Sequence, residues 1–247
     1  MEAGGQKVLK ETTATLRIFR LDPDADPEPH FDTFQVAVTE KMSVLEALFA
    51  ILEQQDPSLS FRYSCRGAVC GSCAMYINGS YGLACRTLIK NLKGGDIIVT
   101  PLPHLPVIKD LVVDVTAFYE KMTSVMPYLE TRAAAPEREF HQSPRDRRAL
   151  DEVTDCIWCA SCHSACPLTW ANKEYLGPAA LTKVYRFVAD SRDQAGPQRL
   201  QIVNQEDGAW RCHTIFNCVE ACPKNINQTE AIEKLRRKTL ARRLKFW

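Results

Sequence analysis

The sequence predicts an α+β protein of two domains, a small β-grasp domain followed by an all-helical domain. Two observations support this division. Alternating apolar side chains and one capped helix occupy the first hundred residues, whereas helical periodicity and two cysteine runs occupy the rest. A length of 247 residues suits two domains of ordinary size, and we expect the boundary near residue 110.

The first domain begins with two predicted strands. Residues 14–20 and 34–38 alternate apolar and polar side chains, and the Pro- and Asp-rich residues 22–29 lie between them as a turn or loop. This pattern predicts a hairpin. We expect the polar residues 1–13 to form a flexible tail before it.

A helix and further strands complete the first domain. Ser43 and Glu46 have the spacing of a capping box at the start of a helical apolar pattern. Short strands are expected at residues 74–77 and 96–100. Two strands, a helix and more strands together predict a β-grasp domain over residues 14–110.

The remaining residues, 111–247, are predicted to form a helical domain. Helical periodicity runs over residues 110–126, and the Pro-, Glu- and Arg-rich residues 127–144 are expected to form a connecting loop. Further helices are expected over residues 146–156, 178–190 and 228–245.

Four cysteines in the first domain have the spacing C-x4-C-x2-C-x11-C, which is typical of plant-type [2Fe–2S] ferredoxins. Gly67 and Gly71 allow this loop to wrap tightly and to turn backbone N–H groups toward sulfur. A structural zinc site is the alternative, but zinc sites pair two short C-x2-4-C hooks, and no such hook precedes Cys70. The predicted [2Fe–2S] ligands are Cys65, Cys70, Cys73 and Cys85.

The second domain contains two cysteine runs that match each other. Residues 156–167 read C-x2-C-x2-C-x3-C-P, the bacterial ferredoxin spacing, in which the fourth cysteine binds a different cluster from the first three. Residues 212–223 fit this pattern position for position, except that Ile215 replaces the second cysteine. We therefore expect a bacterial ferredoxin-like domain with two clusters.

Crossed ligation assigns the ligands of these two clusters. One set has four thiolates and predicts a [4Fe–4S] cluster, and the other has three and predicts a [3Fe–4S] cluster, because a cubane corner without a ligand tends to lose its iron. The predicted [4Fe–4S] ligands are Cys156, Cys159, Cys162 and Cys222, and the predicted [3Fe–4S] ligands are Cys166, Cys212 and Cys218.

Composition and charge agree with a metal-binding protein in a reducing compartment. The 11 cysteines are an odd number, and neither a signal peptide nor an Arg-rich transit peptide is recognisable at the N-terminus. Lys and Arg number 31 against 30 Asp and Glu. Eleven thiolates around oxidised cores add about −6 to this balance, so basic residues near the clusters are expected to compensate them.

The domain order and the missing corner resemble the iron–sulfur subunit of succinate dehydrogenase, in respiratory complex II, over roughly residues 14–235. The stretch 175–193, YLGPAALTKVYRFVADSRD, looks more like the dehydrogenase than the related quinol:fumarate reductase. The resemblance implies electron transfer from the FAD of a flavoprotein partner through [2Fe–2S], [4Fe–4S] and [3Fe–4S] to a quinone at the interface with membrane-anchor subunits, with or without haem. The alternative is a fumarate reductase subunit that works in the reverse direction.

The resemblance also implies a quinone edge beside the three-iron cluster. The matching residues are Pro167, Trp170 and His213, with Ile215 beside them. The second Trp of the family's Trp pair is replaced by Ala171. A purely structural role for Trp170 and His213, as a core aromatic and a hydrogen-bonded neighbour of the cluster, is the alternative.

Other classes of function are less well supported. The chain lacks a nucleophile–base pair and a nucleotide loop, so we expect no dicarboxylate site in it. The basic residues near the C-terminus suit a solvated helix face or anionic lipid headgroups, and we expect no nucleic-acid partner. A free ferredoxin and a zinc-dependent interaction module remain as alternatives. Without a transit peptide, we expect the chain on the cytoplasmic face of a bacterial inner membrane, held by anchor subunits, rather than in a mitochondrial matrix.

Overall fold

The computed structural model describes residues 12–131 and 136–244 of the chain. The chain divides into two compact units, residues 1–113 and 114–247, and each is described by itself. Most of the expected N-terminal tail, residues 1–11, lies outside the described residues, as do Lys245, Phe246 and Trp247. Thr12 and Thr13, also expected in the tail, belong to the first strand.

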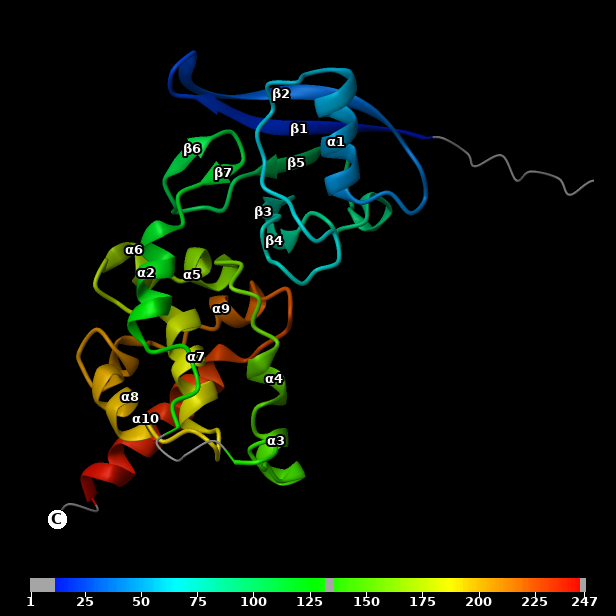
Figure 1. Ribbon diagram of the computed structural model, residues 1–247. Coiled ribbons are helices and arrows are strands. Elements are labelled where there is room, and N and C mark those ends of the chain that lie inside the picture. The colour runs from blue at the N-terminus through cyan, green and yellow to red at the C-terminus, as the bar shows by residue number, and fades with distance from the viewer. Residues whose placement is uncertain (1–11, 132–135, 245–247) are drawn as a thin grey trace, which may run out of the picture. The chain divides into compact units, whose positions relative to one another are not determined.

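The first unit contains a five-stranded mixed sheet (Figure 1). Its strands are β1 (Thr12–Asp22), β2 (Asp26–Val38), β3 (Ala74–Ile77), β4 (Ser80–Leu83) and β5 (Ile97–Thr100). The order across the sheet is β2-β1-β5-β3-β4, in which β1 and β5 are parallel and the other neighbours are antiparallel. A first domain built on a sheet is confirmed, while the parallel pairing of β1 and β5 was not predicted.

The β1–β2 hairpin is longer than the sequence indicated. The turn expected over residues 22–29 is confined to the three residues between β1 and β2, because strand pairing continues through Arg20 opposite His30. Phe19 and Phe31, which face each other across the hairpin, stack edge to face with ring centroids 6.0 Å apart. Such cross-strand aromatic pairs stabilise the part of a hairpin that extends past the buried core.

Helix α1 (Val44–Gln54) begins at the predicted capping box. The Glu46 N–H donates to Ser43 Oγ, and the Ser43 N–H donates to the Glu46 carboxylate at 2.7 Å. The helix packs on β2 and buries Val44, Leu48 and Ile51 completely. The 3-10 turn η1 (Ile89–Asn91) follows later, before β5.

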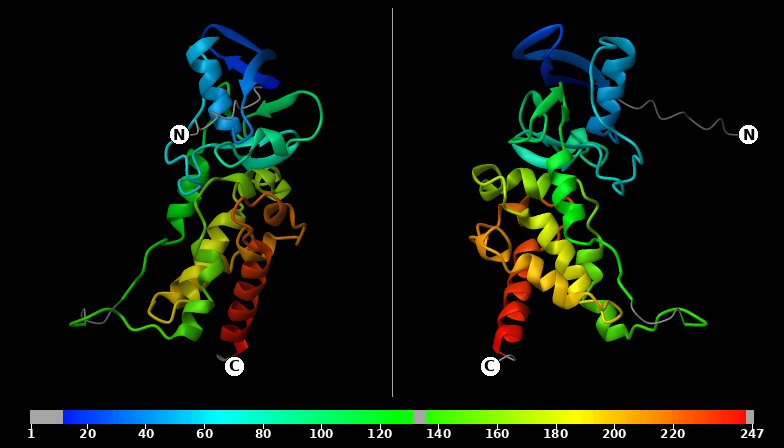
Figure 2. Two further views of the ribbon diagram at one scale, coloured as in Figure 1. Left: turned by 90° about the vertical axis from the view of Figure 1, so that its right-hand side faces the viewer. Right: turned by 60° about the vertical axis from the view of Figure 1, so that its left-hand side comes forward.

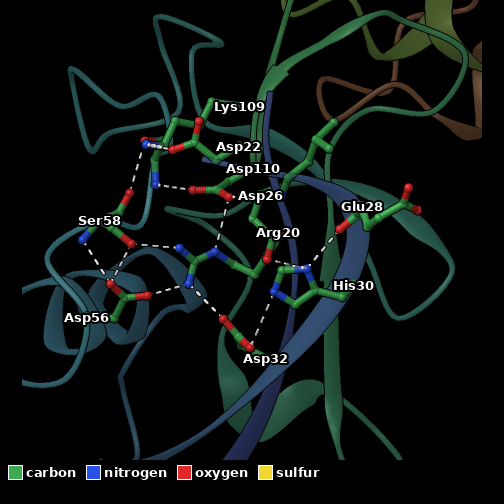
Figure 3. Close-up of polar contacts among 12 residues, drawn as sticks. Arg20, Asp22, Asp26, Glu28, His30, Asp32, Asp56, Ser58, Lys109 and Asp110 are labelled. Carbon is green, nitrogen blue, oxygen red and sulfur yellow. Dashed lines mark hydrogen bonds and ion pairs between the residues drawn. The ribbon is translucent and has the colours of Figure 1, made fainter. Parts of the chain in front are cut away.

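Arg20 on β1 organises a polar network that the sequence did not predict (Figure 3). Its guanidinium donates to the carboxylates of Asp32, Asp56 and Asp110. Asp110 is 1% exposed and also accepts the N–H groups of Leu21 and Ser60. A buried carboxylate needs such partners, so these bonds fix residue 110 within the first unit.

This network explains why the helix expected over residues 110–126 starts late. Asp110 has a left-handed backbone, with φ of 46°, and its N–H donates to Leu21 O at 2.8 Å. A residue held in this way cannot begin a helix. The chain instead forms the small hairpin of β6 (Val107–Lys109) and β7 (Val112–Val113), and α2 covers only Thr116–Ser124.

The regular elements of the second unit are all helices, with no strand among its described residues (Figures 1 and 2). Its longer helices are α2, α7 (Gly177–Val188), α8 (Gly196–Val203) and α10 (Gln228–Leu244), and its short ones are α3 (Pro144–Arg148), α4 (Asp151–Thr154), α5 (Ser161–Ala165), α6 (Pro167–Ala171), the 3-10 turn η2 (Ala209–Arg211) and α9 (Asn217–Glu220). Helix α7 is almost completely buried and packs against α2, α4, α5, α8 and α10.

Two expectations for this unit need correction. The helix predicted over residues 146–156 is broken into α3 and α4, between which Leu150 turns into the core with no exposed surface. Helix α8 was not predicted. Its Arg199 is completely buried, whereas a charged residue is ordinarily expected at the surface. The described residues of the expected loop 127–144 contain no helix or strand before Pro144.

Candidate iron–sulfur centres

The first cysteine loop turns its backbone N–H groups inward, as its glycines predicted. The N–H groups of Gly67, Val69 and Cys70 all donate to Cys65 Sγ at 3.3 Å. These backbone hydrogen bonds, that of Gly67 first, lower the pKa of the Cys65 thiol to about 6. A thiolate that accepts several N–H groups is the form that binds iron.

Each cysteine of this group lies close to at least one other cysteine of the group. The Cys65 N–H donates to Cys70 Sγ at 3.5 Å, and Cys73 interacts with both Cys85 and Cys70. Burial raises the pKa of the Cys73 thiol to about 12, and the neighbouring Cys85 and Cys70 thiols also oppose its ionisation. Four thiols gathered under a layer of backbone N–H groups fit a [2Fe–2S] cluster.

Arg66 attaches this loop to helix α1. Its guanidinium carbon lies 4.7 Å from the ring centroid of Phe49 on α1 and 5.8 Å from that of Tyr63. The rings of Phe49 and Tyr63 themselves meet edge to face at 4.6 Å. The loop is therefore fixed by side-chain packing on one side and by its inward N–H groups on the other.

The two later cysteine runs fold alike, position for position. Trp158 and Thr214, each two residues after the first cysteine of its run, have φ of 56° and 58°. Ala160 and Phe216, two residues further on, have φ of 64° and 70°. Residues other than glycine seldom adopt this left-handed backbone conformation. Its repetition at matching positions therefore places Ile215 at the position that Cys159 has in the first run.

After the left-handed pair, each run continues into a short helix that ends near its last cysteine. Helix α5 carries Cys162 and helix α9 carries Cys218. A proline follows the last cysteine of each run. The Asn217 side-chain N–H donates to Ala165 O at 3.3 Å, which joins the two runs.

The seven cysteines of these runs separate into the two groups that crossed ligation predicts. One hollow, with about 320 Å³ of empty space including space open to solvent, is lined by Cys156, Cys159, Cys162 and Cys222. Burial raises the pKa of Cys162 well above its ordinary value, and its neighbours Cys159 and Cys156 raise it further. A group of four buried and half-buried thiols is unfavourable as thiolates unless a cationic core compensates it.

The second hollow has about 310 Å³ of empty space and is lined by Cys166, Cys212 and Cys218, with Ile215 beside them. Burial raises the pKa of Cys218 to about 11, and the nearby Cys166 and Cys212 oppose its ionisation too. Ile215 is 47% exposed, so it is a rim residue and not part of the core. No group of three or more His, Cys, Asp or Glu in the described residues is arranged around a single metal ion.

Tyr175 is a neighbour of this second group that cysteine spacing did not reveal. It lines the same hollow and is 1% exposed. Burial raises the pKa of its phenol, and the adjacent Cys212, Cys166 and Cys218 raise it further. The phenol therefore stays protonated beside the three thiols.

Comparison with known proteins decides the family. Residues 15–120 match the 2Fe-2S iron-sulfur cluster binding domain, and residues 148–223 match the 4Fe-4S dicluster domain. The chain is 47% identical over 221 residues to the succinate dehydrogenase iron-sulfur subunit of Paracoccus denitrificans, which covers 89% of this chain and 85% of the relative. The chain belongs to the succinate dehydrogenase iron–sulfur subunit family.

Two further relatives agree. The mitochondrial succinate dehydrogenase [ubiquinone] iron-sulfur subunit 1 of Oryza sativa subsp. japonica is 46% identical over 230 residues, 91% of this chain and 82% of the relative. A chain of the "Mycobacterium smegmatis Sdh1 complex in the apo form" superposes with a TM-score of 0.84 at 26% identity, covering 94% of this chain and 98% of that one.

Family membership establishes the role of the chain. An iron–sulfur subunit of succinate dehydrogenase is the electron-transfer subunit of complex II, and it works with a flavoprotein subunit that holds FAD and with membrane-anchor subunits. Subunits of this family carry [2Fe–2S], [4Fe–4S] and [3Fe–4S] clusters. The fumarate reductase alternative is not favoured, because the Paracoccus and Oryza relatives are both named succinate dehydrogenase subunits. Among the described residues of this subunit, no helix is both long enough and apolar enough to span a membrane.

The residues expected at the quinone edge of the iron–sulfur subunit are only partly brought together. Pro167, His213 and Ile215 all line the three-cysteine hollow. Trp170 lies on α6, three residues after Pro167, but it does not line the hollow. Its side chain is 43% exposed. A core position for Trp170 is therefore wrong.

Proposed function

We propose that the three cysteine groups hold the three clusters of the subunit, in the assignment that spacing predicts. The [2Fe–2S] ligands are Cys65, Cys70, Cys73 and Cys85; the [4Fe–4S] ligands are Cys156, Cys159, Cys162 and Cys222; the [3Fe–4S] ligands are Cys166, Cys212 and Cys218. The observation that supports the assignment most is the repeated left-handed backbone of the two runs. It aligns Ile215 with Cys159 and leaves the second group one thiolate short.

The domain bounds proposed with these clusters are residues 14–110 for the [2Fe–2S] domain, extended to Thr12 by strand β1, and 111–247 for the helical domain. The Arg20 network supports a boundary close to Asp110, since it ties that residue to β1.

The residues of the chain position the clusters and set their environment. The clusters, when bound, accept and release single electrons. Backbone N–H groups around Cys65 stabilise negative charge at the first centre. Cys166 belongs to the first run but binds the third centre, and Cys222 belongs to the second run but binds the second centre. This crossed ligation holds the two centres next to each other, as electron transfer between them requires.

The three-cysteine hollow is the proposed exit to quinone. Pro167, His213 and Ile215 line it, and Trp170 lies on the adjoining helix α6. Ile215 and Phe216 are each 47% exposed, and exposed apolar side chains at the rim suit contact with membrane-anchor subunits. We place this edge against the quinone and the anchors, on the cytoplasmic face of a bacterial inner membrane.

Substitution of His213 tests the quinone edge. In purified complex, His213→Ala is expected to slow succinate-driven quinone reduction about tenfold or more, while reduction of an artificial dye that accepts electrons at the flavin stays unchanged. His213 is exposed at the hollow, so its loss removes a polar contact there without opening a core cavity. His141→Ala, at another exposed histidine, is the matched control and should change neither rate. Equal loss of quinone and dye reduction would mean structural damage and would remove His213 from the quinone edge.

A further inference from the structure

Lys183 on helix α7 is a half-buried cation at the four-cysteine group. Its Nζ lies 5.3 Å from the ring centroid of Trp158, which is part of the first cysteine run. Its charge also interacts with the Cys156 thiol. Neither feature was visible in the sequence, because Lys183 follows Trp158 by 25 positions and is on a different element.

Lys183 has no carboxylate partner among the described residues, unlike Arg186 on the same helix and Lys234 on α10. Arg186, one turn further along α7, pairs with Asp190 at 2.9 Å, and Lys234 pairs with Glu230 at 2.6 Å. The ion pairs formed by the part of the chain that the structure describes include none for Lys183. Burial lowers the pKa of Lys183, and the positive charge of Arg186 lowers it further. Negative charge at Cys156 raises it.

A partly buried ammonium without a counter-charge is unfavourable, and an aromatic ring compensates only part of that loss. The negative charge that interacts with Lys183 comes from Cys156 of the four-cysteine group. Four thiolates around a +2 core leave a net charge of about −2, which becomes about −3 when the core accepts one electron. The cation therefore interacts more favourably with the reduced centre than with the oxidised one.

We propose that Lys183, held against the Trp158 ring, is a charge-tuning residue that raises the reduction potential of the [4Fe–4S] cluster. The inference rests on the proposed assignment of Cys156 to that cluster. One electron is added to the cluster, no proton moves, and the lysine keeps its charge throughout. Its effect is to favour arrival of the electron at the middle centre of the subunit.

The test is a redox titration of the intact complex, followed by the electron-spin resonance signals of the separate clusters. Lys183→Met removes the charge and keeps most of the side-chain length. We expect the equilibrium constant for reduction of [4Fe–4S] to fall about tenfold, which is 59 mV for one electron. The [2Fe–2S] and [3Fe–4S] clusters should shift by less than half as much. Lys183→Arg, which keeps the charge, should restore the wild-type value within about twofold.

Lys238→Met is the matched control, since it removes one exposed charge from α10 of the same unit. It should leave all three potentials unchanged. The proposal is overturned if Lys183→Met shifts [4Fe–4S] no more than this control, if all clusters shift equally, or if Lys183→Arg behaves like Lys183→Met.

Loss of the cluster is an informative outcome too. If Lys183→Met and the polar Lys183→Gln both lose the [4Fe–4S] signal while Lys183→Arg retains it, the charge is needed to hold the cluster, which supports the proposal. Loss in all three variants would mean that packing decides, and would overturn it. A wild-type complex without a [4Fe–4S] signal would instead contradict the ligand assignment, so the two failures are distinguishable.

Discussion

At the scale of single residues, Ile215 decides the chemistry of the last centre. It occupies the position of Cys159 in the repeat of the two runs and lines the hollow formed by the other three thiols. A branched apolar side chain cannot bind iron. In the proposed ligand assignment, the corner of the cluster at this position has no protein ligand, and the three-iron form follows.

Replacing Ile215 with Cys restores the fourth thiolate and is expected to convert [3Fe–4S] to [4Fe–4S]. The complex should lose the electron-spin resonance signal of the oxidised three-iron centre, keep the other two clusters and reduce quinone more slowly. A fall of about a thousandfold in the equilibrium constant for reduction of this centre corresponds to about 180 mV for one electron. Ile215→Ser, with a similar small polar side chain but no thiol, should keep the three-iron signal. An unchanged oxidised three-iron signal in a folded Ile215→Cys protein would mean that residue 215 does not face the missing corner.

The cysteines were predictable from sequence because their spacing carries the information. Each run folds locally, and the left-handed residues Trp158 and Ala160 lie within it. Tyr175 and Lys183 were not predictable, since they reach the cysteines from α7 and the turn before it. Their roles depend on tertiary packing, which no spacing rule describes.

At the scale of elements, helix starts were predictable where a capping residue or a proline marks them. The capping box of α1 and the proline in the first turn of α7 both lie where the sequence placed them. The helix expected from residue 110 failed for a long-range reason: Arg20, 90 residues earlier, binds the Asp110 carboxylate. Helix α8 was missed although Pro197 lies in its first turn, because the helix has only eight residues and no capping side chain. A fully buried arginine stabilises it instead.

Arg199 is the residue that attaches α8 to the rest of its unit. Its guanidinium pairs with Asp193 at 2.6 Å, and both side chains are 0% exposed. It also donates to the carbonyl oxygens of Met126 and Tyr128, which anchors the start of the segment after α2. The Phe187 ring covers the guanidinium at 4.8 Å.

Removing this arginine should destabilise the second unit strongly. Arg199→Met leaves Asp193 buried without its cation and two carbonyl groups without their donor, so we expect a loss of about 3–5 kcal/mol in the free energy of unfolding. Thermal unfolding of the purified complex measures the change. Arg147→Met is the control: its ion pair with Asp151 is exposed at 3.4 Å, and its loss should cost at most about 0.5 kcal/mol. Equal stability of the two variants would contradict the anchoring role of Arg199.

At the scale of the whole molecule, the eleven cysteines account for the function of the chain. All eleven are free of disulfides, and the structure gathers them into three groups of four, four and three. Each unit thereby contains the cysteines of its own centre or centres. The direction of electron flow, from the flavoprotein to the membrane anchor, follows from membership of the family. The sequence predicted this organisation because each ligand set uses cysteines from one or two short segments of the chain.

The metal content of the complex tests all three groups at once. With ligand sets of four, four and three thiolates, the subunit should hold two, four and three irons, about nine in all, and essentially no zinc. Iron and zinc are counted in anaerobically purified complex against the protein concentration, with any haem iron subtracted from its optical spectrum. Ile215→Cys provides an internal check, because a restored corner should raise the count to about ten. Stoichiometric zinc, or iron near two, would contradict the three-cluster assignment. A count that stays at nine in Ile215→Cys would reject the alignment of the two cysteine runs and leave the other ligands in place.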